Sequence, residues 1–157
     1  MLVISNTTPI ISLCSVNKEF ILKELFNEIN IPNAVNNELI SSKKVGFKFA
    51  ENSWVNVFNI KNRQAVNILL KDLDLGESEV IIGSLELKAN VTIIDENIGY
   101  QIAKYHKLNV NRTLSLLKTA KDLGIIKNIK PILLEMINKG RWYSQLVVTE
   151  FLKSINE

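Results

Sequence analysis

The stretch that decides the fold is Leu2-Val3-Ile4-Ser5-Asn6-Thr7-Thr8-Pro9-Ile10-Ile11. The short apolar run 2–4 predicts a buried strand, and an apolar helical pattern resumes after Pro9. The polar side chains 5–8 therefore lie where a strand gives way to a helix. This position is where parallel α/β sheets keep their binding and catalytic groups.

A second stretch of the same kind lies far along the chain, where Val91-Thr92-Ile93-Ile94 runs directly into Asp95-Glu96-Asn97. The apolar run predicts a second buried strand that ends in two acidic residues. If the two strands are parallel neighbours, Asn6 and Asp95 emerge at the same edge of the sheet. The sequence therefore predicts a polar site built from distant parts of the chain.

The composition is that of a folded domain. The chain has 157 residues, of which 46% are hydrophobic and 22% are charged. This length suits one compact domain covering residues 1–157. No run approaches the ~18 uncharged apolar residues that a membrane span needs, so we expect a cytoplasmic protein that does not bind membranes.

Apolar periodicity predicts alternating strands and helices. Expected strands are 2–4, 28–31, 54–58, 91–94 and 108–110, and expected helices are 17–26, 34–40, 43–52, 62–70, 80–87, 98–106, 114–123, 131–138 and one beginning after Ser144. Alternation of this kind predicts a three-layer α/β/α fold with a central parallel sheet of about four to five strands.

Several kinds of chemistry are excluded by missing residues. His106 is the only histidine and lies in a predicted helix, so a Ser-His-Asp or Cys-His site has no support. No glycine-rich loop follows the first strand, as a nucleotide-binding loop would require. The single cysteine, Cys14, lies in an apolar run and is interpreted as part of the core. Zinc would lack ligands.

Side-chain oxygens are what remains. They belong to Asn6, Glu38, Glu79 and Asp95, with Glu77 and Glu96 in reserve. Such a group suits Mg²⁺ or Mn²⁺, which could activate a water for attack on a phosphodiester. Simpler interpretations also exist: Glu38 could lie at the edge of an apolar stripe, and Glu77 and Glu79 could interact with a helix dipole.

Charge is divided unevenly along the chain. Residues 1–96 hold 9 Lys and Arg against 12 Asp and Glu, and residues 97–157 hold 10 against 4, which together give the net charge of +3. The basic half could follow a nucleic-acid backbone beside a metal centre in the acidic half. From this imbalance alone, ordinary solvated helix faces are the more common explanation.

The chain also resembles the PIN-domain family, the fold of VapC-type toxins and related ribonucleases. The matching segments are 3–11, 31–39, Leu73-Asp74-Leu75-Gly76-Glu77-Ser78-Glu79-Val80-Ile81, 93–96, and 116–126 through the closing helix. The resemblance holds in order and spacing over nearly the whole chain. It implies a PIN-like, metal-dependent nuclease fold in which Glu38, Glu79 and Asp95 occupy the family's acidic positions.

Three positions depart from the family pattern. The usual first metal-binding aspartate is Asn6, a neutral ligand that should lower metal affinity. The turn before the late helix, commonly Thr-Gly-Thr, is Asn111-Arg112-Thr113, which brings Arg112 near the site. Tyr100 stands where an arginine often follows the Asp-Glu pair.

The resemblance leads to two main hypotheses. The first is an endoribonuclease, the toxin of a toxin–antitoxin pair, acting on single-stranded or structured RNA as a homodimer with an antitoxin partner. Its catalytic residues are Glu38, Glu79 and Asp95; its metal ligands for Mg²⁺ or Mn²⁺ are these three and Asn6; its RNA contacts are Lys104, Lys107, Arg112 and Lys118. The second is a catalytically weakened nucleic-acid- or protein-binding module. A receiver-like domain is a weaker third alternative.

Overall fold

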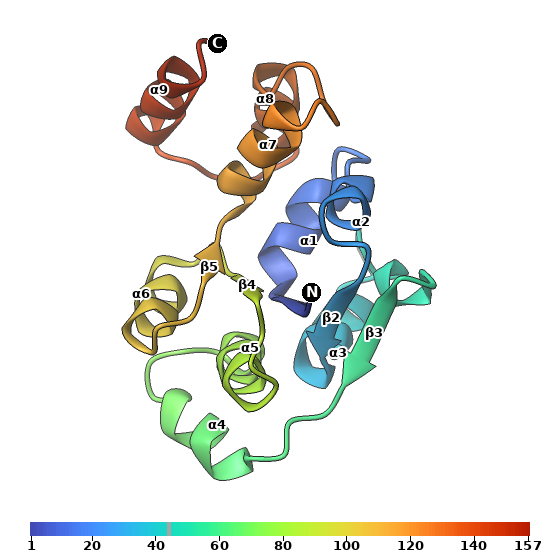
Figure 1. Ribbon diagram of the computed structural model, residues 1–157, viewed down its shortest axis with the longest axis vertical. Helices are drawn as coiled ribbons and strands as arrows, with labels where there is room; N and C mark the ends of the chain where they lie inside the picture. The colour runs from blue at the N-terminus through green and yellow to red at the C-terminus, as the bar shows by residue number, and fades with distance from the viewer. Residues whose placement is uncertain (44) are drawn as a thin grey trace.

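The computed structural model describes residues 1–43 and 45–157, which contain a five-stranded sheet. Its strand order is β3-β2-β1-β4-β5, and neighbouring strands pair in parallel (Figure 1). The strands are β1 Val3–Ser5, β2 Ile29–Pro32, β3 Val55–Phe58, β4 Val91–Ile93 and β5 Val110–Asn111. The predicted parallel sheet of about four to five strands is confirmed.

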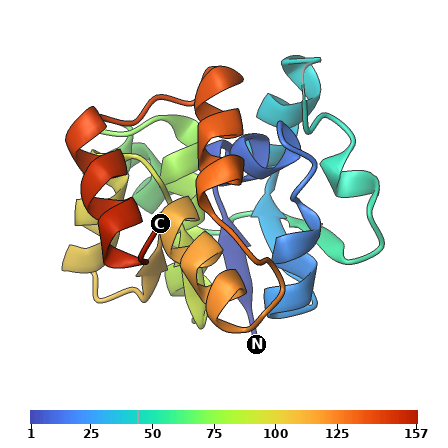
Figure 2. The ribbon, with the colours of Figure 1, turned by 90° about the horizontal axis from the view of Figure 1, so that it is seen from above.

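Helices cover both faces of the sheet and complete a three-layer α/β/α fold, as predicted. They are α1 Thr7–Cys14, α2 Phe20–Phe26, α3 Asn33–Ser41, α4 Arg63–Leu69, α5 Leu75–Glu86, α6 Asn97–Tyr105, α7 Thr113–Asp122, α8 Lys130–Asn138 and α9 Gln145–Ser154. Figure 1 shows α1, α2 and α7 on one side of the strands and α4 and α5 on the other. Helix α3 contacts both α1 and α5. Helices α7 to α9 gather at one side of the fold (Figure 2).

The core lies between the sheet and its two helix layers. Val3 and Ile4 of β1 and Ile93 of β4 are completely buried, as are Ile29 and Ile31 of β2. A parallel sheet covered on both faces buries successive residues of each strand, which explains the continuous apolar runs in the sequence. Among the described residues, no helix is long and apolar enough to span a membrane.

The strand order places a topological switch point between β1 and β4. From β1 the chain proceeds to β2 on one side, whereas β4 pairs with β1 on the other, with Ser5 opposite Ile93. The backbone N–H of Asn6 donates to the carbonyl of Ile93 over 2.9 Å. The ends of the two strands therefore meet at one edge, as the sequence predicted, where α/β sheets commonly bind ligands.

Three predicted helices differ from the structure. The helix expected over 80–87 begins earlier, at Leu75, because Asp74 and Glu77 form a capping box there. The helix expected over 17–26 begins only at Phe20, because Asn17 adopts a left-handed turn with φ of 53°. The helix expected over 43–52 is wrong in its described part, where turns lead to a short 3₁₀ helix, Phe49–Glu51. Gly46, with φ of +91°, interrupts helical geometry there. Lys44 lies outside the described residues.

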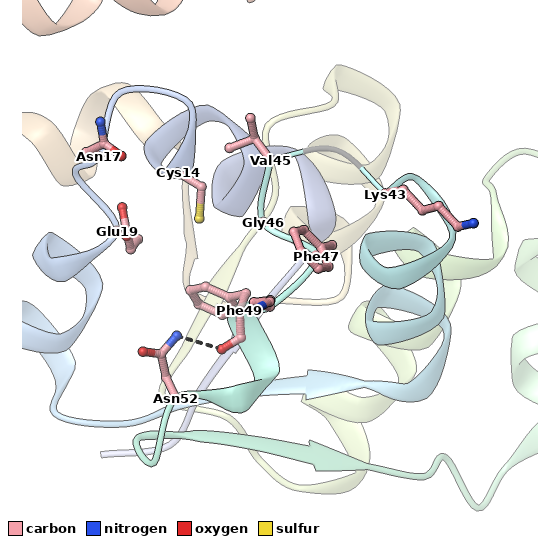
Figure 3. Close-up of a pocket in the computed structure, with 10 residues that line it drawn as sticks. Cys14, Asn17, Glu19, Lys43, Val45, Gly46, Phe47, Phe49 and Asn52 are labelled. Carbon is pink, nitrogen blue, oxygen red and sulfur yellow. Dashed lines mark hydrogen bonds between the residues drawn. The ribbon is translucent and has the colours of Figure 1, made fainter.

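Cys14 lies at the end of α1, beside a cavity of about 540 Å³ formed with the segment 45–49 (Figure 3). Its side chain packs against the core. Burial, with a smaller contribution from the nearby Glu19 carboxylate, raises the pKa of its thiol to about 12. A thiol that stays protonated at neutral pH is a poor nucleophile, so Cys14 acts as a packing residue.

Candidate functional site

Asn6 follows β1 at the switch point and is only 3% exposed. Its Nδ2 donates to Glu96 Oε2 over 3.1 Å, whereas its Oδ1 is buried without a hydrogen-bond partner. Because a carboxylate can only accept, the contact with Glu96 fixes the orientation of the amide. The unpartnered carbonyl oxygen is costly in a folded protein and is therefore informative about the site.

The unpartnered oxygen of Asn6 faces Gly76 in the first turn of α5. A Cβ built on Gly76 would lie 3.3 Å from Asn6 Oδ1, 3.3 Å from Glu38 Oε2 and 3.4 Å from Asp74 Oδ1. Oxygens from three separate elements therefore lie close together beside Gly76. Any side chain at position 76 would contact these oxygens.

The two threonines after Asn6 hold acidic residues of distant elements. Thr7 Oγ1 donates to Glu38 Oε2 over 2.6 Å, and Thr8 Oγ1 donates to Glu96 Oε1. Glu38 lies on α3 and is exposed, whereas Glu96 follows β4 and is partly buried. The first turn of α1 thus positions one carboxylate at the solvent side and one deeper in the site.

Asp74 and Glu77 form a capping box at the start of α5. Glu77 N donates to Asp74 Oδ1 over 2.7 Å, and Asp74 N donates to Glu77 Oε2 over 3.2 Å. Capping accounts for these two acids without any ligand. Burial raises the pKa of Glu77 to about 7; its hydrogen bond with Asp74 opposes the rise, and the negative charges of Asp74, Glu96 and Glu38 add to it.

We call these five residues the acidic cluster: Asn6, Glu38, Asp74, Glu77 and Glu96. Over residues 1–43 and 45–157, no Lys, Arg or His side chain forms an ion pair with its carboxylates. Carboxylates gathered without a cation repel one another, and a divalent ion would remove that repulsion. The cluster therefore has the electrostatic character of a cation site.

Glu79, a predicted metal ligand, is directed elsewhere. It is 4% exposed and lies on α5. Its Oε1 accepts from Arg63 Nη1 over 2.5 Å, and its Oε2 accepts from the backbone N–H of Ala34 over 2.9 Å. Because both oxygens have donors and the charge has a cation, Glu79 is bound to the start of α3 and to α4.

Asp95, another predicted ligand, also has partners for both oxygens. Its Oδ1 accepts from Thr113 N, and its Oδ2 accepts from Thr113 Oγ1, both over 2.7 Å. Arg141 Nη2 donates to Oδ2 over 3.1 Å. Burial raises the pKa of Asp95, and the hydrogen bonds from Thr113 and the charge of Arg141 counteract that rise. Asp95 thus fixes the start of α7 beside β4.

The predicted RNA contacts lie in different places. Lys104 lies in the last turn of α6 and Lys107 follows the helix, and both side chains are exposed. Lys118 is also exposed and pairs with Asp122 over 2.6 Å. Arg112 immediately precedes α7, and its Nη2 donates to Asn97 over 3.0 Å, close to Glu96 along the chain. Of the four, Arg112 is the residue beside the site.

The oxygens beside Gly76 form a mixed set of carboxylate and amide donors. In the part of the chain that the structure describes, no group of three or more His, Cys, Asp or Glu side chains is arranged to hold one ion. The space at Gly76 combines two carboxylate oxygens with the Asn6 amide oxygen instead. Mg²⁺ usually takes only one or two carboxylates and keeps several waters, so this donor set fits it.

Sequence reasoning placed Glu77 and Glu96 in reserve and did not propose Asp74 as a ligand. The signal for Asp74 was the pattern Asp74-Leu75-Gly76-Glu77, in which an N-cap acid precedes a glutamate by three residues. Gly76, which leaves the space open, lies inside this pattern. Asp95 and Glu96 are adjacent in sequence, and only the structure shows that Asp95 contacts Thr113 and Glu96 contacts Asn6.

An acidic cluster at the switch point of a parallel sheet defines an α/β domain of a class that binds ligands at this edge. A family model described as a PIN domain matches residues 2–157. The chain belongs to the PIN-domain family. A search of the curated proteins finds no match to this chain.

Proposed function

We propose that residues 1–157 form a single PIN-like domain that acts as a metal-dependent endoribonuclease. The observation that carries the proposal is the acidic cluster, which has no cationic partners among the described residues and contains a buried, unpartnered Asn6 oxygen. Membership of the PIN-domain family supports a nuclease-like module. Oxygen ligands of this kind suit Mg²⁺ or Mn²⁺.

The residues around Gly76 would hold the ion. Asn6 and Glu38 supply oxygens directed at this space, and Asp74 supplies a third. Thr7 and Thr8 orient Glu38 and Glu96 by donating hydrogen bonds. A bound divalent ion supplies Lewis-acid activation of water and neutralises charge on a phosphodiester.

Glu79 and Asp95 have two alternative roles in this proposal: metal-binding catalytic residues or positioning residues. Their assignment as catalytic residues and ligands is a prediction that a cleavage assay can test. The contacts of Glu79 with Arg63 and of Asp95 with Arg141 support a positioning role instead. In a positioning role, E79Q and D95N would lower the free energy of unfolding. They would leave the Kd for the metal nearly unchanged.

The direct test is cleavage of a 5′-labelled single-stranded RNA in the presence of Mn²⁺. We expect E38Q to lower the rate at least tenfold, because it removes a charged ligand from the site. E135Q, which removes the same charge from an exposed position on α8, should cleave like the wild type. Equal rates for E38Q and wild type would remove the acidic cluster from the reaction.

A second candidate is a catalytically weakened nucleic-acid- or protein-binding module, favoured by the neutral Asn6. The variant N6D separates the two functions. It replaces the amide that donates to Glu96 by a carboxylate, so it should destabilise the protein without metal and raise metal affinity. Two results together would identify the weakened module: the wild type binds RNA without cleaving it, and N6D cleaves RNA.

We further propose that the nuclease is the toxin of a toxin–antitoxin pair and forms a homodimer. The support is the resemblance to VapC-type toxins in the segments quoted above. Induced expression in a bacterial host should arrest growth for wild type and not for E38Q. Growth arrest by both variants would separate toxicity from RNA cleavage, and sedimentation measures the oligomeric state.

A further inference from the structure

A cavity of about 300 Å³ lies next to the acidic cluster. Its lining includes Asp95, Glu96, Arg112, Arg141, Trp142 and Tyr143. Glu96 belongs to both sites, because it also accepts from Asn6 and Thr8. A ligand in this cavity would therefore extend directly to the acidic cluster.

Arg112 offers a positive charge to this cavity. Over residues 1–43 and 45–157, no carboxylate forms an ion pair with it. Its guanidinium carbon lies 4.0 Å from the centre of the Tyr100 ring, and its Nε is buried without a hydrogen-bond partner. Stacking on Tyr100 and the bond to Asn97 hold the guanidinium in place and leave its charge for an anion.

Arg141 forms another part of the lining, with a different electrostatic role. Its charge is balanced by Asp95, and its guanidinium carbon lies 4.7 Å from the centre of the Tyr143 ring. Its Nε is also buried without a partner. The pair with Asp95 shields that carboxylate, so an anion bound by Arg112 meets less repulsion.

Trp142 stands on the rim of the cavity with 77% of its surface exposed. It lies between Arg141 and Tyr143 in the segment that precedes α9. An exposed indole buries little apolar area and contributes little to the fold. Its flat surface suits stacking against a nucleobase, because every base presents a π face.

We propose that this cavity is a nucleotide subsite for single-stranded RNA, with a phosphate on Arg112 and a base stacked on Trp142. A volume of about 300 Å³ is at the lower end of small-ligand sites, which suits one nucleotide. The relevance of RNA as the ligand rests on the proposed function. Binding at the subsite requires no cleavage and can be measured separately.

The experiment measures binding of a fluorescein-labelled RNA of mixed sequence, about ten nucleotides long, by anisotropy in EDTA. We expect W142A and R112A each to raise the Kd roughly tenfold, and W142F to retain most of the affinity. R112A should also reduce the salt dependence of binding by about one counterion.

Matched controls are available on the surface. Y105A removes an aromatic side chain that is 83% exposed on α6, outside this cavity. K23A removes one positive charge from an exposed position on α2. Neither variant should change the Kd. Losses equal to those of W142A and R112A would indicate general surface attraction and overturn the subsite.

The remaining outcomes separate the subsite from the nuclease. RNA binding that depends on Trp142, without cleavage in Mn²⁺, supports the subsite and contradicts the enzyme. Cleavage with an unchanged KM in W142A supports the enzyme and overturns the subsite. A change of oligomeric state in W142A, with unchanged RNA binding, would assign this surface to a protein partner and overturn the proposal.

Discussion

The acidic cluster differs from Glu79 and Asp95 in how its negative charge is balanced. Glu79 and Asp95 each have an arginine partner, and donors satisfy both oxygens of each carboxylate. Glu38, Asp74, Glu77 and Glu96 have no ion pair in the described part of the chain. The ion pairs support a positioning role for Glu79 and Asp95, whereas the unpaired acids are available to a cation.

This difference is favourable only if something offsets the repulsion within the cluster. A carboxylate that keeps its charge among like charges destabilises the folded state. A bound cation would stabilise the fold in proportion to the logarithm of its concentration over its Kd. The comparison therefore predicts that a cation stabilises the fold through the acidic cluster and not through Glu79 and Asp95. The following variants test this difference.

The largest expected loss of stability comes from breaking a paired acid. R141A would leave Asp95, whose side chain is 3% exposed, without its cation. We expect the free energy of unfolding to fall by about 2 kcal/mol, less than for a fully buried pair because Thr113 still donates to Asp95. Urea unfolding measures this change, with or without Mn²⁺.

A double variant controls the interpretation of R141A. D95N/R141A removes the charge that R141A leaves uncompensated, so it should be more stable than R141A alone. An R141A protein as stable as wild type would contradict the assignment of Asp95 to the scaffold.

An effect of intermediate size is expected for E77Q, whose stability relative to the wild type should depend on pH. Burial and neighbouring acids raise its pKa to about 7 from 4.5, so the folded state holds a proton that the unfolded state loses. Stability from this group is present below the unfolded pKa and declines as the pH rises through about 7. In EDTA, E77Q should therefore become more stable than wild type as the pH increases.

Thermal unfolding of E77Q and wild type between about pH 5 and pH 8 measures this difference. Glutamine keeps the oxygen that accepts from Asp74, so the helix cap is retained. Addition of Mn²⁺ should reduce the advantage of E77Q, since a cation favours the ionised glutamate. A constant difference at all pH values would show that Glu77 keeps an ordinary pKa.

The smallest effect is expected for an exposed pair. Lys118 and Asp122 lie four residues apart on α7, with about half of each side chain exposed to solvent. K118A should change the free energy of unfolding by only about 0.3 kcal/mol, because solvent screens such pairs. Urea unfolding measures this change as well. A loss as large as that of R141A would contradict the expectation that the exposed Lys118–Asp122 pair contributes less stability than the Arg141–Asp95 pair.

The sequence predicted much of the framework. Apolar runs located the five strands, and the polar residues after 2–4 and 91–94 correctly indicated one sheet edge. Asn6 and Glu38 were predicted as site residues, and their oxygens converge at Gly76. The strand predictions succeed because apolar periodicity is a local pattern, whereas the role of Asn6 and Glu38 as ligands stays a prediction.

Side-chain direction could not be predicted in the same way. Asp95 and Glu96 are adjacent, yet Asp95 is directed at Thr113 and Glu96 at Asn6. Glu79 lies two residues after Glu77, but Arg63 and Ala34 take its oxygens. These partners come from elements distant in sequence, so a single sequence shows which acids exist but not which ones remain unpaired.

The central claim is that the oxygens around Gly76 bind a divalent cation, and calorimetric titration with Mn²⁺ tests it most directly. G76A keeps every oxygen ligand but places a methyl group 3.3 Å from Asn6 Oδ1 and Glu38 Oε2. We predict that wild type and E135Q bind Mn²⁺, and that G76A and E38Q bind at least tenfold more weakly. Equal binding by wild type and G76A, or no binding by wild type, would contradict the account.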